Sequence, residues 1–287
     1  MFKRQRTGSV VCASCGSLVG VNDDQCYTCG RRNPGLWGFG PALRRLGLEH
    51  GFQSIIVYGC AALYVISLIV TVAFGGSIMS GSGNPLGLLA PAPQILLMLG
   101  ASGAQPVFAN GMWWTVLSAG WLHAGALHIL FNMLWVRSLA PTTAEIYGVA
   151  RMIIIYTIAG VAGFILSSAC GLLSIPLFGA PLTVGASAPI FGLLAALMHY
   201  GRRGGSSLIH ADAKGYAIAI FVFGLIMPGV DNAAHLGGFA GGYLASVWLD
   251  PLKPERVNHM IGALVCLGLT LFAIVASVVK ILPYLVR

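Results

Sequence analysis

The chain has 287 residues, 57% of them hydrophobic and only 8% charged, with a mean hydropathy of +0.83. A soluble domain carries roughly a quarter charged residues, so most of this surface cannot face water. The formal net charge is +8, but the basic residues lie in the N-terminal tail and between apolar segments, which is typical of membrane topology rather than of nucleic-acid binding.

The first 50 residues are polar and lack a hydrophobic run near the start, so we expect no secretory signal peptide. They contain two CxxC pairs separated by ten residues: Cys12, Cys15, Cys26 and Cys29. Four thiolates at this spacing are typical of a closed, structural Zn²⁺ site. Because so short a segment cannot build a core, the metal would supply its folding energy. We predict a zinc ribbon over 1–35 and a basic linker over 36–52.

Disulfide pairing is the competing interpretation of these four cysteines. The topology predicted below places them in the reducing cytosol, where metal binding is favoured over disulfides. The ribbon either docks a cytosolic partner or merely folds, and the sequence does not decide between these roles. The remaining cysteines, Cys60, Cys170 and Cys266, lie singly in apolar segments, which is typical of packing residues.

Seven apolar segments follow the linker, and their lengths predict membrane-spanning helices rather than barrel strands. They lie at 53–74, 112–136, 149–171, 186–200, 215–229, 232–249 and 258–284. The fourth and fifth are short and rich in glycine, so we expect them inside the bundle. Residues 75–111 form an uncharged, apolar loop that we expect at the membrane interface. The predicted fold is an all-α polytopic bundle, with six helices over 53–249 and a seventh over 250–287.

The distribution of Lys and Arg predicts the orientation of this bundle. With a cytoplasmic N-terminus, 14 of the 16 basic residues lie inside and only Lys280 and Arg287 lie outside. Because cytoplasmic segments carry the excess of basic residues, we expect the N-terminus in the cytoplasm and the C-terminus outside. A bacterial inner membrane is the expected location.

The second apolar segment carries polar side chains where a membrane helix seldom tolerates them. His128 and Asn132 are four residues apart and share a helix face, and His123 lies nearby. Ionisable groups within a span are costly, so they are candidates for a functional site. Polar contacts between helices are the alternative for any one of them, and the histidine spacing matches no recognisable haem or metal pattern.

The fourth segment begins with Gly185, Ala186 and Ser187. Free backbone N–H groups at a helix N-terminus favour developing negative charge, so a nucleophile there can have its oxyanion stabilised by its own amide. The alternative is a capping serine or a small residue for helix packing.

The sixth segment carries His235 one turn before Gly238 and Gly242, which form a GxxxG face that admits a close neighbouring backbone. Such a contact would let His235 reach a serine on the adjacent helix. The alternative is a packing motif with an incidental histidine. We expect Asp231 in the outer loop, so the simplest catalytic device is a Ser–His dyad.

Taken in order, these residues resemble the rhomboid family of intramembrane serine proteases. The family's HxxxxHxxxN pattern is met in the second segment, its GxS motif in the fourth and its AHxxGxxxG motif in the sixth. The matching residues are His123, His128, Asn132, Gly185, Ser187, Ala234, His235, Gly238 and Gly242. Each motif alone is weakly specific, whereas the ordered set is highly specific. A seventh C-terminal span is a known variation of the family.

The resemblance implies that Ser187 attacks the scissile carbonyl and that His235 takes its proton. It also implies an oxyanion site made by the Ser187 amide with the side chains of His128 and Asn132, supported by His123. No metal is needed for this chemistry.

Further positions follow from the same resemblance. Phe191 holds the place of an aromatic that packs on the dyad histidine, and Pro189 is tolerated in the first helical turn. The fifth span resembles a lateral gate for the substrate. Two positions depart from the family pattern. Ala188 replaces a glycine and could crowd the oxyanion region, and Trp114 is followed by Thr115 instead of the usual arginine.

The expected activity is cleavage of transmembrane segments near the outer face, at small residues in helices that unwind readily. The main alternative is a non-catalytic rhomboid-like protein that binds membrane clients and uses the ribbon as an adaptor. Such proteins typically lack the serine or the histidine. A transporter or channel is less favoured, because neither inverted repeats nor a charged path is visible.

Overall fold

The computed structural model describes residues 4–48, 54–78, 88–175 and 178–286. Lys3 and Arg287, which belong to the charge count, lie outside these residues, as does the end of the predicted linker. Strands β1 (Ser9–Val11) and β2 (Leu18–Gly20) pair antiparallel in the N-terminal unit. A 3-10 turn (Leu36–Gly38) and helix α1 (Gly40–Leu48) follow, so the linker is partly helical.

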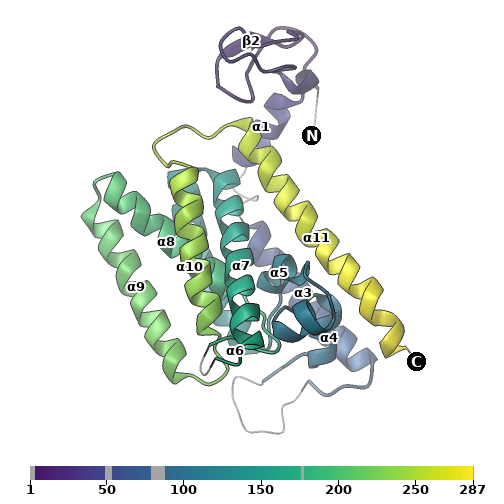
Figure 1. Ribbon diagram of the computed structural model, residues 1–287. Helices are drawn as coiled ribbons and strands as arrows, with labels where there is room; N and C mark the ends of the chain where they lie inside the picture. The colour runs from purple at the N-terminus through teal and green to yellow at the C-terminus, as the bar shows by residue number, and fades with distance from the viewer. Residues whose placement is uncertain (1–3, 49–53, 79–87, 176–177, 287) are drawn as a thin grey trace.

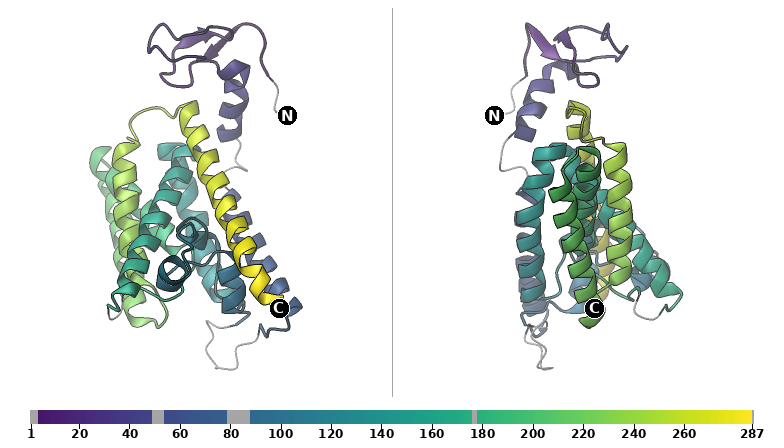
Figure 2. Two further views of the ribbon diagram at one scale, coloured as in Figure 1. Left: turned by 45° about the vertical axis from the view of Figure 1, so that its right-hand side comes forward. Right: turned by 90° about the vertical axis from the view of Figure 1, so that its left-hand side faces the viewer.

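Seven helices form the bundle beneath this unit (Figure 1). They are α3 (Ile55–Ala73), α6 (Ala126–Tyr147), α7 (Val149–Leu172), α8 (Ser187–Arg203), α9 (Ser207–Ile226), α10 (Asn232–Trp248) and α11 (Val257–Leu285). Each overlaps one of the seven predicted apolar segments. The N-terminal unit and the end of α11 lie at opposite ends of the molecule, as both views in Figure 2 also show.

Among the described residues, α3, α7, α9 and α11 are each long and apolar enough to cross a membrane. The bent pair Thr115–Trp121 and Ala126–Tyr147 adds a fifth candidate if it counts as one span. Helices α8 and α10 have 17 residues each, about 26 Å of helix, which is slightly short for a hydrocarbon core of about 30 Å. The chain is a multi-pass membrane protein.

Two predicted spans differ from the observed helices. The segment 112–136 is not one helix, because α5 (Thr115–Ser118) and the turn Ala119–Trp121 meet α6 at 91°. Extended backbone at Leu122 and Gly125 makes this break. Helix α6 then continues past Arg137 and ends at Tyr147. Arg137, one of the 14 basic residues expected on the cytoplasmic side, therefore lies within a helix and not in a loop after the predicted span.

Helix α9 was expected to be short and buried, and the structure contradicts this. It begins eight residues before the predicted start, because the Ser206 side chain caps it by accepting from the Ile209 amide at 3.4 Å. Most of its side chains are exposed on the surface of the bundle. Helix α8, in contrast, is almost entirely buried, as predicted.

The described part of the loop 75–111 contains regular secondary structure. Helix α4 (Pro93–Leu99) ends at Gly100, whose φ of 102° closes the helix in the left-handed conformation. A π-helical turn follows at Gln105–Ala109. The apolar side chains of α4 pack with Met112, Leu122 and Ile281 in a small second core. This core joins the loop to α11.

Small residues let the central helices approach closely. A Cβ atom on Gly238 would collide with the Ala188 backbone, and one on Gly242 would collide with the Gly192 backbone. On the other side of α10, a Cβ atom on Gly237 would lie 2.6 Å from the Ala162 carbonyl oxygen of α7. The predicted GxxxG face is therefore the contact between α10 and α8.

Candidate active site

Ser187 is the first residue of α8, with Ala186 at the cap position. Gly185 before it has a φ of 131°, and its amide donates to the Ala119 carbonyl at 3.0 Å. Pro189, the third helical residue, lacks an N–H that would have no partner inside the helix. Ser187 is half-buried, and it lies where the free amides of a helix N-terminus favour negative charge.

His235 lies in the first turn of α10 and is 3% exposed. The Asp231 side chain caps this helix by accepting from the Ala234 amide at 3.0 Å, and the Ser167 hydroxyl also donates to it. Asp231 is therefore at the helix start and engaged with other groups. Among the described residues, Nδ1 of His235 has no hydrogen-bond partner. The Asp231 side chain therefore does not hydrogen-bond Nδ1 of His235.

Two contacts hold the helices that carry Ser187 and His235 against each other. The Phe191 ring, one turn after Ser187, stacks on the His235 ring with centroids 4.4 Å apart and planes 20° apart. Gly238, one turn after His235, touches the backbone of Ala188. The starts of α8 and α10 are thus held at the same level, with Ser187 and His235 on adjoining helices.

His128 lies against the turn that precedes Ser187. A Cβ atom on Gly185 would lie 2.6 Å from Nε2 of His128, so this position needs glycine both for space and for its positive φ. The Ala124 amide donates to Nδ1 of His128 at 3.3 Å. Because Nδ1 accepts, the neutral ring carries its proton on Nε2. His128 therefore presents a donor beside Gly185.

His123 and Asn132 complete this polar group. The His123 ring is fully buried and meets the His128 ring edge-on, with centroids 5.2 Å apart. The Asn132 amide donates to the His128 carbonyl at 2.8 Å, which uses one of its two N–H bonds. The contacts join His123, His128 and Asn132 to one another and, through Gly185, to the start of α8. Gly242 lies deeper in α10, against Gly192 of α8.

Ala188 does not crowd the oxyanion region in the way its sequence position suggests. Its side chain is fully buried in a small apolar cluster with Ala119, Phe164 and Ala234. A Cβ atom on Gly163 of α7 would lie only 2.7 Å from the Ala188 methyl. The methyl therefore faces α7, because the first turn of α8 directs it into the helix contact.

A ring pair that the sequence motifs do not reveal joins α6 to α9. Trp135 and Tyr216 meet edge-on with centroids 5.2 Å apart. Neither residue belongs to a motif, and they are 81 residues apart in the chain, so only the folded structure brings them together. Trp135 lies three residues after Asn132 on α6, so this contact with α9 is close in sequence to the motif of α6.

The four ribbon cysteines form a candidate metal centre. Their sulfur atoms all lie within 4.8 Å of one another, with Cys12 to Cys29 at 3.8 Å and Cys15 to Cys26 at 3.7 Å. A disulfide needs about 2.05 Å, so none is formed among them. A tetrahedral site with bonds of about 2.3 Å has edges of about 3.8 Å, which fits these separations.

Local turns shape this centre. Gly16 and Gly30 have positive φ, and their amides donate to the carbonyls of Cys12 and Cys26 at 3.1 and 2.8 Å. Hydrogen bonds with Ser17 lower the pKa of Cys15 to about 6, which favours the thiolate that binds metal.

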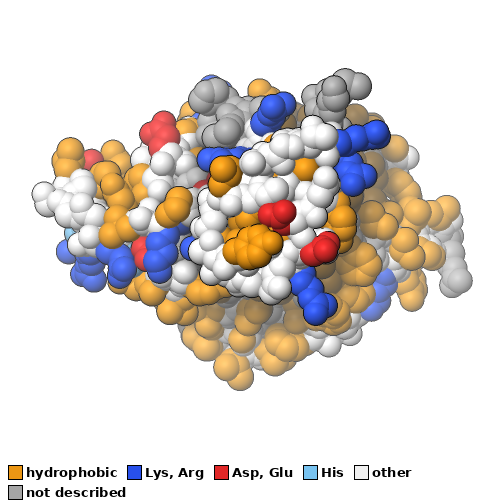
Figure 3. Space-filling view, turned by 90° about the horizontal axis from the view of Figure 1, so that it is seen from above, with side chains coloured by type: hydrophobic (Ala, Val, Ile, Leu, Met, Phe, Trp, Pro, Cys, Tyr) orange, Lys and Arg blue, Asp and Glu red, His pale blue; other side chains and the backbone are white. Residues whose placement is uncertain are grey.

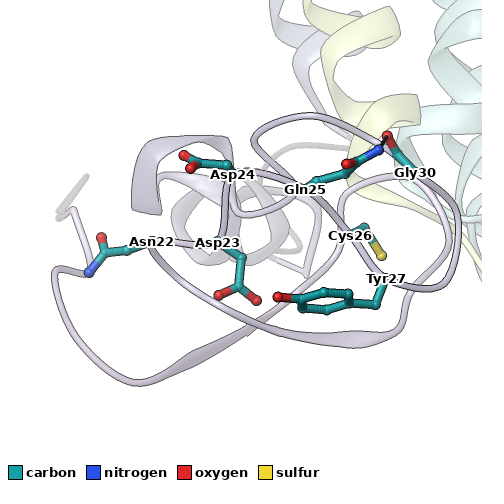
Figure 4. A pocket seen from close by; sticks show the side chains of 7 residues that line it. All are labelled: Asn22, Asp23, Asp24, Gln25, Cys26, Tyr27 and Gly30. Carbon is teal, nitrogen blue, oxygen red and sulfur yellow. Dashed lines mark hydrogen bonds between the residues drawn. The ribbon is translucent and has the colours of Figure 1, made fainter.

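A hollow of about 570 Å³ lies beside Cys26 on the ribbon surface. It is lined by Asn22, Asp23, Asp24, Gln25, Cys26, Tyr27 and Gly30 (Figure 4). It belongs to the ribbon, whereas Ser187 and His235 lie in the bundle, so it is no part of the candidate active site.

Comparison with known proteins places these observations in a family. Residues 110–251 match the family model described as the Rhomboid domain. RHOMBOID-like protein 7 of Arabidopsis thaliana is 35% identical over 178 residues, which cover 58% of this chain and 52% of that protein. Rhomboid protease GluP of Bacillus subtilis is 30% identical over 159 residues, 54% of this chain and 30% of that protein.

A third relative, Rhomboid-like protease 2 of Toxoplasma gondii, is 29% identical over 196 residues, 66% of this chain and 65% of that protein. The chain thus spans about half of the length of the first relative, less than a third of the second and just under two thirds of the third. The matched domain contains all three motifs, from His123 to Gly242. Residues 110–251 of this chain therefore form a domain of the rhomboid family.

Proposed function

We propose that this chain is an intramembrane serine endopeptidase that cleaves transmembrane segments of other membrane proteins with a dyad of Ser187 and His235. The observation that carries the proposal is the stack of Phe191 on His235, one turn after Ser187, at the contact between α8 and α10. A buried histidine beside a helix that begins with a half-buried serine is costly in a membrane protein, and catalysis is a sufficient reason to retain it.

The reaction follows from the positions of the donors. Ser187 Oγ attacks the scissile carbonyl while His235 accepts its proton and then passes it to the leaving amine. The developing oxyanion accepts hydrogen bonds from the Ser187 amide, from Nε2 of His128 and from the Asn132 amide. Water then hydrolyses the acyl-enzyme, with His235 as the base. No metal takes part in these steps.

The substrate reaches the dyad at the edge between α6 and α9. Helix α9 is mostly exposed, and the ring pair Trp135 and Tyr216 closes this edge. A transmembrane helix hides its carbonyls in its own hydrogen bonds, so substrates need a segment that unwinds readily and a small residue at the cut.

The proposed location is a bacterial plasma membrane, with the ribbon in the cytoplasm and the dyad toward the outer face. Figure 3, seen from the ribbon end, shows Lys and Arg side chains gathered around that end of the molecule. Cytoplasmic segments carry such an excess. A reporter fused after Arg287 should be active only outside the cytoplasm. Reporter activity inside the cytoplasm would show that the orientation is the opposite of the proposed one.

The proposed cofactor is one structural Zn²⁺ held by Cys12, Cys15, Cys26 and Cys29. Four protein thiolates leave no open position, so this zinc would fold the ribbon and leave catalysis to the bundle. Elemental analysis of the purified full-length protein should give one zinc per chain. Absence of stoichiometric metal would refute the proposal.

Cleavage of a single-span model substrate by the protein reconstituted in liposomes tests the activity itself. Wild-type protein should cleave it, whereas Ser187→Ala and His235→Ala should not. Cleavage that persists in Ser187→Ala would exclude this mechanism. Substrate binding without cleavage by the wild-type protein would favour the non-catalytic, client-binding alternative.

A further inference from the structure

The C-terminal half of α11 is tied to the segment that precedes α6. The Trp114 indole donates from Nε1 to Ser277 Oγ at 3.0 Å, and Ser277 is fully buried. The Lys280 ammonium lies 5.5 Å from the centroid of the Trp114 ring and donates to the Asn110 carbonyl. Two residues one turn apart on α11 thus hold the same tryptophan, one through its edge and the other through its face.

These contacts differ from the usual behaviour of such residues near the end of a membrane helix. A lysine there ordinarily extends toward water, and a tryptophan lies in the interfacial belt. Here Lys280 bends over an indole and bonds a loop carbonyl, and the cation–π geometry is within the favourable range of about 6 Å. Thr115, which follows Trp114 in the chain, is fully buried and carries no charge. The cation that faces the Trp114 ring is Lys280 of α11.

The segment held by α11 continues to the turn before Ser187. The Ser118 hydroxyl donates to the Gly100 carbonyl at 2.7 Å, which closes the segment on itself. Ala119 follows Ser118, and its carbonyl accepts a hydrogen bond from the Gly185 amide at 3.0 Å. Gly185 is two residues before Ser187, so Trp114 and Ser187 are connected through one short, hydrogen-bonded path.

A second path reinforces the first. Ser102 and Thr183 exchange backbone hydrogen bonds in both directions, at 3.0 and 2.7 Å. Thr115 Oγ1 donates to the Ser102 hydroxyl at 3.3 Å. Thr115, which follows Trp114, is therefore joined through Ser102 to the stretch around Thr183 that leads into α8.

We infer that Ser277 and Lys280 of α11 are positioning residues that orient Ser187 by fixing Trp114 and the segment around it. This inference rests on the proposed function and adds a role for the seventh helix in the reaction. Displacing a reacting group by about 1 Å can cost on the order of 100-fold in rate. Neither residue meets the substrate edge between α6 and α9, so the effect falls on kcat and leaves KM unchanged.

The test compares variants of the full-length protein in liposomes with the single-span substrate. Lys280→Met and Ser277→Ala should each lower kcat by about 10-fold, which corresponds to about 1.4 kcal/mol, with KM within about twofold. Lys280→Arg keeps the cation above the indole and should restore most of kcat. Lys253→Met, in the loop that precedes α11, and the exposed Val279→Ala are controls and should behave as wild type.

Two further readouts separate positioning from stability. The rate at which a fluorophosphonate labels Ser187 should fall with kcat, because labelling needs the nucleophile but no transmembrane substrate. The melting temperature should change much less than the rate. Wild-type kcat in both Lys280→Met and Ser277→Ala would overturn the inference, as would equal losses in Lys280→Met and Lys280→Arg. An inactive wild-type protein would instead overturn the proposed function, and the inference with it.

Discussion

The ribbon and the candidate active site are assembled in opposite ways. The four ribbon cysteines lie within 18 residues of sequence, and two tight turns bring their sulfur atoms together. Ser187 and His235 are 48 residues apart and belong to different helices, and the proposed dyad requires the close packing of α8 and α10. A local motif therefore needs little beyond its own spacing, whereas the dyad depends on the whole bundle.

The largest effect should come from the dyad. Replacing His235 with alanine removes the proposed base but leaves the helix contact at Gly238, so the bundle should fold. Loss of a dyad member should lower kcat by about 10⁴-fold or more, by analogy with soluble serine proteases. Substrate cleavage in liposomes measures it, with His210→Ala on α9 as a matched histidine control. A loss of less than tenfold would show that His235 is not the base.

The contact between α8 and α10 should come next. In Gly238→Val the added side chain meets the backbone of Ala188, so the two helices must separate. We expect a loss on the order of 100-fold in kcat, together with a lower melting temperature. Gly268→Val adds the same atoms on α11, where a Cβ meets nothing within 4 Å. Equal behaviour of the two variants would contradict the proposed importance of this contact.

Phe191→Leu should have a smaller effect. The stack on His235 is lost while an apolar side chain remains, and aromatic pairs contribute about 0.5–1.5 kcal/mol beyond their buried area. We expect kcat to fall by up to about tenfold. Phe272→Leu, on an exposed face of α11, is the control. An unchanged kcat in Phe191→Leu would mean that the stack does not orient the histidine.

The smallest effect on cleavage should come from the ribbon. Cys26→Ser should abolish stoichiometric zinc, and limited proteolysis should then degrade the N-terminal unit, because the metal supplies its folding energy. The dyad lies at a different end of the bundle, so kcat should stay within about twofold, with Cys170→Ser as the control. A large loss of cleavage would show that the ribbon communicates with the bundle.

Such communication would have a structural route. The Asn258 amide in the first turn of α11 donates to the Ala13 carbonyl at 3.2 Å, and Arg31 donates to the Asn258 side chain. Since the other end of α11 holds Trp114, one helix touches both regions. The change in kcat of Cys26→Ser therefore measures how strongly the ribbon affects the candidate active site.

Sequence patterns predicted much of both regions, and the helix boundaries that they missed have physical causes. Among the described residues, each of the seven apolar segments overlaps a helix of the bundle, and α8 begins at Ser187, one residue from its predicted start. The bend before α6 was missed because hydropathy cannot distinguish one apolar helix from two. The start of α9 was misplaced because its first turns are polar and depend on a Ser206 cap.

Contacts between distant residues could not be predicted from one sequence. The pairs Trp135 with Tyr216 and Trp114 with Ser277 follow no local period, so no spacing rule marks them. The outcome for Ala188 is similar, because only the packing of α7 against α8 shows where its methyl points. The dyad residues were predicted as candidates, and their arrangement became visible only in the folded chain.

The most direct measurement of the dyad treats the reconstituted wild-type protein with a fluorophosphonate and maps the modified residue by mass spectrometry. The geometry at the α8–α10 contact predicts a single adduct on Ser187, and almost none when His235 is replaced by alanine. An adduct on another residue, or undiminished labelling of Ser187 without His235, would contradict the proposed dyad.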